Sequence, residues 1–298
     1  MVKEQFWDSP KLSAANLDQL DIIVGIAEEY QQQGYKLTLR QLYYQLVSRD
    51  IIPNKQAEYK KISHILKHGR MAGIVDWNII EDRIRVPYIP YWCTGIPGAL
   101  QDTLKQYRLN RQQNQRVYIE CVSEKDALSG ILRRVTKQYH IRLMINRGYS
   151  SLSAMYDARN RFKSYADAGY RTVIIYLGDH DPSGLDMIRD VRERLAELGL
   201  ASIEVIPIAL TMDQINQYNP PPDPAKITDP RAAWYIQEYG NHSWEVDALP
   251  PNVLTDLLTN TIQGLIDMDI FNEIMVQETA DKDELARLIE DFNEESED

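Results

Sequence analysis

The 298-residue chain has little cysteine and no long apolar run, and each shortage excludes a class of protein. Cys93 and Cys121 are the only cysteines and form no CxxC pair, which excludes a zinc module built on cysteines and favours a reducing compartment. The longest uncharged stretch, from Val86 to Gln101, is too short to span a bilayer and contains prolines. Because the N-terminal residues lack the apolar segment of a signal peptide, we expect a cytoplasmic protein that does not enter a membrane.

The composition is that of an ordinary globular protein, with 44% hydrophobic and 26% charged residues, and the length allows one large or two ordinary domains. A net charge of −11 argues at first against a nucleic-acid partner. The charge is uneven, however. Residues 241–298 hold 16 acidic and 2 basic residues, whereas the segment from Lys36 to Arg70 holds 8 basic and 2 acidic ones, a local charge of +6. The overall charge therefore does not exclude DNA binding.

The first third of the chain has the apolar spacing of helices. This spacing predicts helices over residues 17–34, 39–50 and 55–73, with Thr38 as the N-cap of the second. A turn between the second and third helices is typical of a helix-turn-helix, and the alternating residues 82–92 predict the β wing of a winged helix. We therefore expect a helical winged-helix DNA-binding domain over residues 1–95, followed by a linker over residues 96–115.

From Val117 onward, strands and helices alternate. Apolar runs predict strands over residues 117–122, 141–145, 171–178 and 202–210; a helical pattern follows each of the first three, and a proline-rich loop over residues 219–230 comes after the fourth. Such βα units form a mostly parallel sheet flanked by helices. We expect an α/β domain over residues 116–280 and an acidic tail over residues 281–298.

Carboxylates follow two of these predicted strands. Glu124 comes directly after the first strand, and Asp179 and Asp181 come directly after the third. The carboxyl ends of parallel strands form the functional edge of such sheets, and clustered carboxylates there suit Mg²⁺. Two alternatives remain: the aspartates could only cap the next helix, and Glu120 could replace Glu124 as the ligand.

The runs SEKDAL at residues 123–128 and GDHDPSG at residues 178–184 resemble the Toprim domain, in the form found in the A subunit of topoisomerase VI and its meiotic double-strand-break relatives. The resemblance extends over most of residues 35–210. It implies a Toprim fold in the α/β domain, with Glu124, Asp179 and Asp181 as the Mg²⁺-binding acids. The short chain is most similar to orphan A-subunit-like proteins of bacteria, phages and plasmids.

The same family carries a nucleophilic tyrosine in an Arg-x-x-Tyr-Tyr run on its winged helix, and this chain has TLRQLYYQLV at residues 38–47. Tyr43 falls on the apolar stripe of the predicted helix, whereas Arg40 and Tyr44 lie four residues apart on a more polar face. The resemblance implies that Tyr44 is the nucleophile. Arg40 would then bind the scissile phosphate and favour the phenolate.

The third predicted helix carries basic residues beside its apolar stripe. A basic helix after such a turn would contact DNA phosphates, giving salt-dependent and mostly non-specific affinity, although a solvated helix face explains the same pattern. The candidate DNA-binding residues are Lys60, Lys61, His64, Lys67 and Arg70.

The resemblance implies a type IIB topoisomerase A-subunit-like enzyme that cleaves double-stranded DNA as a homodimer, with the tyrosine of one chain meeting the metal of the other. In that family, the ATPase is a separate subunit, so a partner of this kind is a further expectation. Two other hypotheses are a Toprim nuclease in which metal-activated water attacks, and a non-catalytic DNA-binding accessory protein. Glu245 and Asp247 lie in a predicted alternating strand and are candidates for additional carboxylates near the metal, although the polar face of a strand explains them equally well.

Overall fold

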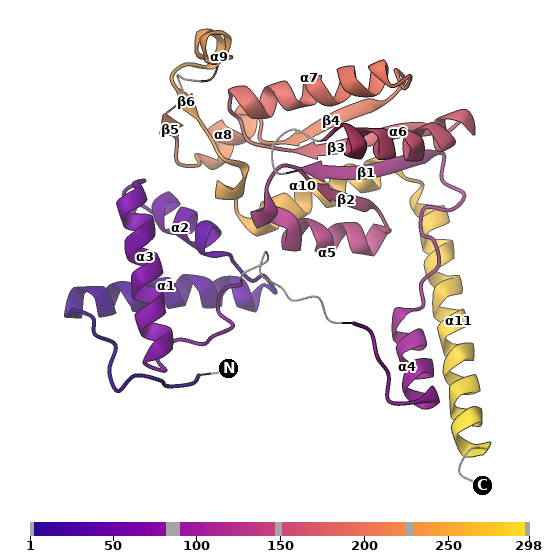
Figure 1. Ribbon diagram of the computed structural model, residues 1–298, viewed down its shortest axis with the longest axis horizontal. Helices are drawn as coiled ribbons and strands as arrows, with labels where there is room; N and C mark the ends of the chain where they lie inside the picture. Colours follow the sequence, from indigo (N-terminus) through magenta and orange to yellow (C-terminus); the bar gives the residue numbers. More distant parts are fainter. Residues whose placement is uncertain (1–2, 82–89, 147–150, 225–228, 230, 296–298) are drawn as a thin grey trace.

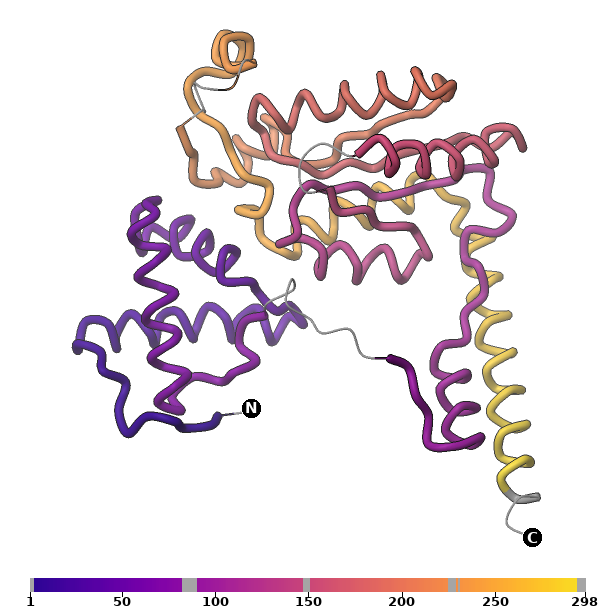
Figure 2. The backbone as a smooth tube through the Cα atoms, in the orientation of Figure 1, coloured from indigo at the N-terminus to yellow at the C-terminus, as the bar shows by residue number. Residues whose placement is uncertain are grey.

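The computed structural model describes residues 3–81, 90–146, 151–224, 229 and 231–295. An N-terminal group of helices lies beside a parallel sheet that has helices on both faces, and a long C-terminal helix runs away from the sheet (Figures 1 and 2).

The three predicted N-terminal helices are confirmed as α1 (Ala14–Gln32), α2 (Leu39–Ser48) and α3 (Gln56–Met71). Thr38 caps α2 as expected: its hydroxyl accepts from the Gln41 amide at 3.3 Å, and the Gln41 side chain accepts in return from the Thr38 amide at 3.0 Å. The apolar stripes of the helices meet in one core, which includes the fully buried residues Leu20, Ile23, Leu42, Leu46, Ile62 and Ile65.

The predicted parallel sheet is also confirmed. Among the described residues it contains β1 (Val117–Ser123), β2 (Arg142–Ile145), β3 (Arg171–Leu177) and β4 (Glu204–Ala209), in the order β2-β1-β3-β4. All three pairings are parallel. The central strands β1 and β3 are buried along almost their whole length, as expected for strands between two helical layers.

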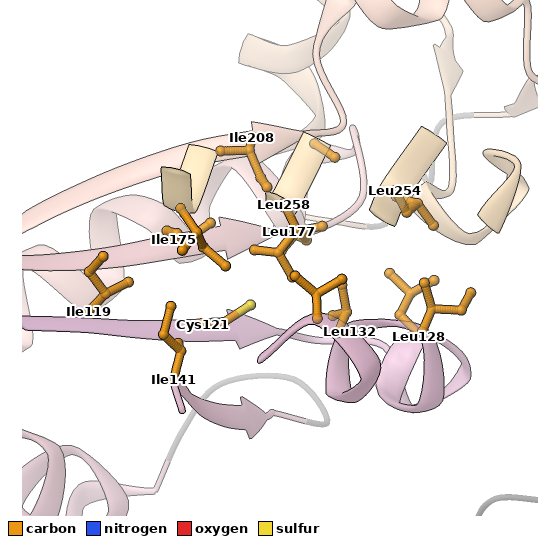
Figure 3. Packing of buried hydrophobic residues seen from close by; sticks show 14 of the residues in the cluster. Ile119, Cys121, Leu128, Leu132, Ile141, Ile175, Leu177, Ile208, Leu254 and Leu258 are labelled. Carbon is orange, nitrogen blue, oxygen red and sulfur yellow. The ribbon is translucent and has the colours of Figure 1, made fainter. Parts of the chain in front are cut away.

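Alternate residues of the central strands supply two cores. Ile119, Cys121, Ile175 and Leu177 pack against α5 (Ser129–Tyr139) and α10 (Pro251–Leu265), as Figure 3 shows. On the other face, Tyr118 and its alternating neighbours pack against α6 (Leu152–Asp167) and α7 (Pro182–Glu197). The result is a three-layer α/β/α arrangement (Figure 1).

Short elements connect the sheet to its surroundings. They are η1 (Asp126–Leu128), α8 (Met212–Tyr218), β5 (Asp223–Pro224), α9 (Ala232–Tyr239), β6 (His242–Ser243) and η2 (Val246–Ala248). The prediction of a strand carrying Glu245 and Asp247 is wrong, because strand β6 ends before them and Asp247 lies in the 3₁₀ turn η2. The amide of Val246 bonds a side chain, Asp179, instead of a neighbouring strand.

The segment predicted as a linker begins with a helix, α4 (Ile96–Gln106), and the predicted tail belongs to α11 (Met268–Glu295). The two helices lie side by side (Figure 1). The boundary expected at residue 281 falls inside α11, where Asp281 accepts a 2.6 Å hydrogen bond from Tyr107. The acidic segment is therefore helical to Glu295, further than its composition indicates, and its start is packed against the α4 region.

The predicted wing falls on residues 82–92, of which 82–89 lie outside the described residues, and residues 90–92 are not in a strand. In the part of the chain that the structure describes, no helix is long and apolar enough to cross a membrane.

Candidate functional site

The carboxylate motifs lie where the strand order of the sheet reverses. From β1 the chain moves to the neighbouring strand β2, toward one edge of the sheet. From β3 it moves to the neighbouring strand β4, toward the other edge. The order therefore reverses between the adjacent parallel strands β1 and β3. Ligands of open parallel sheets bind outside the carboxyl ends of such strands. Glu124 follows β1 and Asp179 follows β3, which places both residues at this point.

The structure brings Glu124 and Asp179 together. Glu124 Oε1 accepts a hydrogen bond of 2.8 Å from the backbone amide of Asp179. Asp181 has the role of a helix cap: its Oδ1 accepts from the Gly184 amide at 2.6 Å and from the Ser183 hydroxyl at 2.7 Å. The helix-capping interpretation is thus correct for one oxygen of Asp181. The Asp179 carboxylate does not cap the helix, because its Oδ1 accepts from the Val246 amide.

Glu120, the alternative to Glu124, has different partners. Arg161 holds its two oxygens at 2.7 and 2.8 Å, and the Tyr118 hydroxyl donates to it at 2.6 Å. The residue is 1% exposed and lies within β1, before the end of the strand. The negative charge of Glu120 is therefore already compensated by Arg161, and the geometry favours Glu124 as the candidate metal ligand.

A segment far along the sequence completes this edge. The backbones of His180 and Trp244 exchange hydrogen bonds of 2.9 and 3.0 Å, and Asp179 Oδ1 accepts from the Val246 amide at 2.9 Å. These bonds bring two more carboxylates beside Asp179. We call the five carboxylates Glu124, Asp179, Asp181, Glu245 and Asp247 the acid edge.

In the part of the chain that the structure describes, two cations contact the acid edge. Lys125 Nζ lies 2.6 Å from Asp179 Oδ2 and 3.5 Å from Glu245 Oε2. Arg40, from α2 of the N-terminal part, pairs with Glu245 and places its Nε 3.0 Å from Asp247 Oδ2. Asp247 is only 1% exposed, and neither of its oxygens accepts a hydrogen bond of good geometry from the described residues.

Among the described residues, the carboxylates of the acid edge outnumber the cations that contact them, and this imbalance affects protonation. Burial raises the pKa of Asp179 to about 7, with Glu124 and Asp247 adding to the rise, although the Lys125 ammonium opposes it. Burial alone would lower the pKa of Lys125, but Asp179 and Asp247 raise it. Burial thus acts in opposite directions on the two groups, whereas the neighbouring carboxylates raise both pKa values.

Tyr44 lies next to this charge network. Arg40 Nη2 donates to the Tyr44 hydroxyl at 3.4 Å, and the guanidinium lies 5.6 Å from the centre of the Tyr44 ring. Tyr44 is nevertheless 5% exposed, as buried as Tyr43, and η2 packs against α2 and adds Ala248 to the N-terminal core. Burial raises the pKa of Tyr44 well above its ordinary value, and Arg40 only partly opposes this rise.

The structure divides the predicted DNA-binding residues into two groups. Arg70 is half-buried, and its Nη2 donates to the carbonyl oxygens of Trp77 at 3.0 Å and Ile80 at 3.2 Å. Its guanidinium therefore fixes the chain after α3. The exposed residues of α3 in this set are Lys60, Lys61, His64 and Lys67.

The donor types of the acid edge suit a hard divalent cation such as Mg²⁺, since they are all carboxylate oxygens and those of Asp179 and Asp247 are buried. The Asp247 oxygens, which accept no hydrogen bond of good geometry from the described residues, and the excess negative charge among those residues also fit a bound cation. In the described residues, however, no group of three or more His, Cys, Asp or Glu side chains is already placed to hold a metal ion. The residues thus fit the ion in chemistry and charge, and Lys125 holds one of the contacts that the ion would need.

In comparisons with protein-family models, with curated proteins and with solved structures, nothing matches the chain.

Proposed function

We propose that the protein is a Mg²⁺-dependent transesterase that cleaves double-stranded DNA, in the manner of a topoisomerase VI A subunit. The observation that carries this proposal is the position of Arg40. One guanidinium contacts the hydroxyl of Tyr44 and two carboxylates of the acid edge, Glu245 and Asp247. Lys125 in turn contacts Glu245 and the candidate metal ligand Asp179, so this ligand and the candidate nucleophile belong to one charge network, although they come from distant parts of the sequence.

The proposed reaction is a phosphoryl transfer. The Tyr44 hydroxyl oxygen attacks a backbone phosphorus and loses its proton, and a phosphotyrosine bond forms. The bond from phosphorus to the 3′ oxygen breaks, and that oxygen takes up a proton to become a free hydroxyl. Mg²⁺ held by Glu124, Asp179 and Asp181 would neutralise the charge that develops on the phosphate. Arg40 would hold the same phosphate beside Tyr44.

The reaction requires a change at the contact between α2 and η2. Tyr44 is 5% exposed in this arrangement, in which α2 packs against η2, and a side chain so buried cannot reach a duplex. Arg40 must also exchange its carboxylate partners for a phosphate. We therefore propose that DNA binding separates α2 from η2 and exposes Tyr44 and Arg40 together.

Denaturant trapping tests this proposal. The full chain is mixed with double-stranded DNA and Mg²⁺, stopped with detergent, and examined for protein covalently linked to DNA. We expect an adduct with the wild type and none with Tyr44→Phe. Tyr43→Phe is the matched control, because Tyr43 is equally buried but donates its hydroxyl to Asn54 at 2.7 Å instead of contacting Arg40. An adduct that survives Tyr44→Phe would exclude Tyr44 as the nucleophile.

The burial of Tyr44 favours a second candidate, a metal-dependent nuclease in which water attacks and Tyr44 only packs. In that case, Tyr44→Phe would still cut DNA without any adduct, whereas Asp179→Ala combined with Asp181→Ala would abolish cutting. Cleavage unaffected by the two aspartate substitutions would exclude both enzymatic candidates. An absence of cleavage by the wild type would favour a DNA-binding accessory protein.

The resemblance to the topoisomerase VI A subunit also supports a homodimer and a separate ATPase subunit as proposals. Sedimentation of the purified chain measures the first. Pull-down of an ATPase from the source cells tests the second.

A further inference from the structure

Lys125 holds the position on Asp179 that a divalent cation would need. Its ammonium nitrogen is 2.6 Å from Asp179 Oδ2, and the other oxygen of Asp179 accepts from the Val246 amide at 2.9 Å. Both oxygens of this carboxylate are therefore engaged. A cation bound through Oδ2 would lie within a few ångströms of the ammonium, and two positive charges at that separation repel each other strongly at a site with little water.

The position of Lys125 in the chain makes the ammonium a local and movable charge. The residue directly follows Glu124, and its backbone amide donates to the Ser123 hydroxyl at 3.3 Å, which fixes the start of the side chain at the end of β1. The side chain is 20% exposed, so one direction leads to solvent. A flexible lysine stem can leave Asp179 along that direction while the backbone stays in place.

We propose that Lys125 is an internal counter-ion that competes with the divalent cation for Asp179. In the absence of the ion, the ammonium compensates the buried carboxylate, which would otherwise be destabilising. When the ion binds, the ammonium leaves. The affinity of the acid edge for divalent cations is then lower than its carboxylates alone would give. This inference rests on the proposed function, because it takes the acid edge as the cation site.

Removal of the ammonium tests the competition without DNA. The full chain is titrated with MnCl₂ and with MgCl₂ in a calorimeter, and wild type is compared with Lys125→Met. We expect Lys125→Met to bind the divalent ion at least about tenfold more tightly, since a neighbouring opposite charge commonly changes the proton affinity of a carboxylate by one to three pKa units. Lys125→Arg keeps the charge and should bind no more tightly than the wild type.

Lys163→Met is the matched control, because it removes the same charge from the same domain. Lys163 pairs with Asp167 at 2.7 Å on the surface of α6, away from the acid edge. Equal affinities for Lys125→Met, Lys163→Met and the wild type would overturn the proposal. If neither the wild type nor Lys125→Met binds either ion, the metal-dependent function itself fails. Binding by Lys125→Met alone supports competition.

A second measurement uses the wild type, so that it does not depend on the folding of a variant. Lysine acetylation followed by mass spectrometry compares the reactivity of Lys125 with and without MgCl₂. We expect several-fold faster labelling of Lys125 when the ion is present, with Lys163 as the internal reference. Unchanged labelling at a concentration of ion that saturates the calorimetric site would contradict the displacement of Lys125.

Discussion

Gly184 has no room for a side chain. A Cβ atom added to it would lie 2.2 Å from the carbonyl oxygen of Asp179, which is backbone and cannot rotate away. The turn from β3 into α7 can therefore close only with glycine at this position, and this close approach is what places Asp179 and Asp181 at the acid edge.

We expect Gly184→Ala to lower the free energy of unfolding by about 1–3 kcal/mol, as overpacked sites do, and to reduce DNA cleavage. Urea denaturation measures the first effect. Gly25→Ala is the control: Gly25 is also helical but has nothing within 4 Å of its added Cβ, so this substitution should be neutral or stabilise by about 0.5–1 kcal/mol. Equal effects of the two substitutions would contradict the steric account.

Glu278 is a buried carboxylate with an unusually complete set of partners. Arg111 Nη2 donates to it at 2.8 Å, Lys282 at 2.6 Å and the amide of Leu109 at 3.1 Å. Burial alone would raise the pKa of Glu278, but these donors lower it from an ordinary 4.5 to about 2. The residue connects α11 to the segment that leads into β1.

The lowered pKa fixes the direction of a pH effect. A carboxyl group with a depressed pKa in the folded state stabilises the protein above its ordinary pKa and loses this contribution as the pH falls. We expect Glu278→Gln to lose about 2–3 kcal/mol of stability at pH 7, with the deficit closing between pH 4.5 and pH 2. Glu273→Gln, on an exposed position of α11, should show no comparable deficit in urea denaturation across the same pH series.

At the scale of elements, α3 presents exposed positive charge. Each lysine that contacts a DNA phosphate releases counter-ions, and the slope of log affinity against log salt concentration falls by about 0.9 when one such contact is lost. We expect Lys60→Ala and Lys67→Ala each to weaken binding to double-stranded DNA and to reduce this slope by about that amount. Lys137→Ala, which removes an exposed lysine from α5, should leave the slope unchanged in fluorescence anisotropy titrations. An unchanged slope for all three variants would show that Lys60 and Lys67 of α3 do not contact DNA phosphates.

Elements that depend on local pattern could be predicted from the sequence. The apolar spacing and the cap at Thr38 define α2, and the buried apolar runs define β1 and β3, because these signals lie within a few residues of one another. The position of Glu124 and Asp179 at one edge followed from the expectation of parallel strands.

Features that depend on distant contacts could not be predicted in this way. Polar alternation indicated a strand through Asp247, but the Val246 amide bonds Asp179, 67 residues earlier, and the chain turns into η2. Helix periodicity placed Tyr44 on a more polar face, but Tyr44 is buried in the structure and α2 packs against the distant η2. The sequence pattern placed Arg70 on a basic DNA-binding face, but in the structure its guanidinium donates to the carbonyl oxygens of Trp77 and Ile80. A helical wheel contains only the helix itself, so none of these partners is visible in it.

At the scale of the whole molecule, the N-terminal part contacts the α/β part of the same chain. Arg40 pairs with Glu245 and Asp247, and Asn54 donates to Asp223 at 2.8 Å. The Tyr35 hydroxyl adds a bond of 3.1 Å to Thr255. Tyr44 is thereby next to the acid edge of its own chain. The resemblance to the topoisomerase VI A subunit implies the opposite arrangement, in which each tyrosine serves the metal site of a second chain.

Mixing two inactive variants distinguishes these arrangements. Tyr44→Phe keeps its acid edge and lacks the candidate nucleophile, whereas Asp179→Ala keeps the nucleophile and lacks the acid. The contact through Arg40 predicts that Tyr44 works with its own chain, so an equimolar, re-equilibrated mixture should form no covalent adduct with DNA. If the tyrosine instead serves the partner chain of a dimer, about half of the dimers are mixed and each has one complete site, giving about a quarter of the wild-type adduct. A mixture of Tyr43→Phe with Asp179→Ala is the matched control, because it should give about half of the wild-type adduct under either arrangement. Recovery of adduct in the first mixture would show that the contact between Arg40 and Asp247 belongs to a resting state, and that the reacting tyrosine crosses to the other chain.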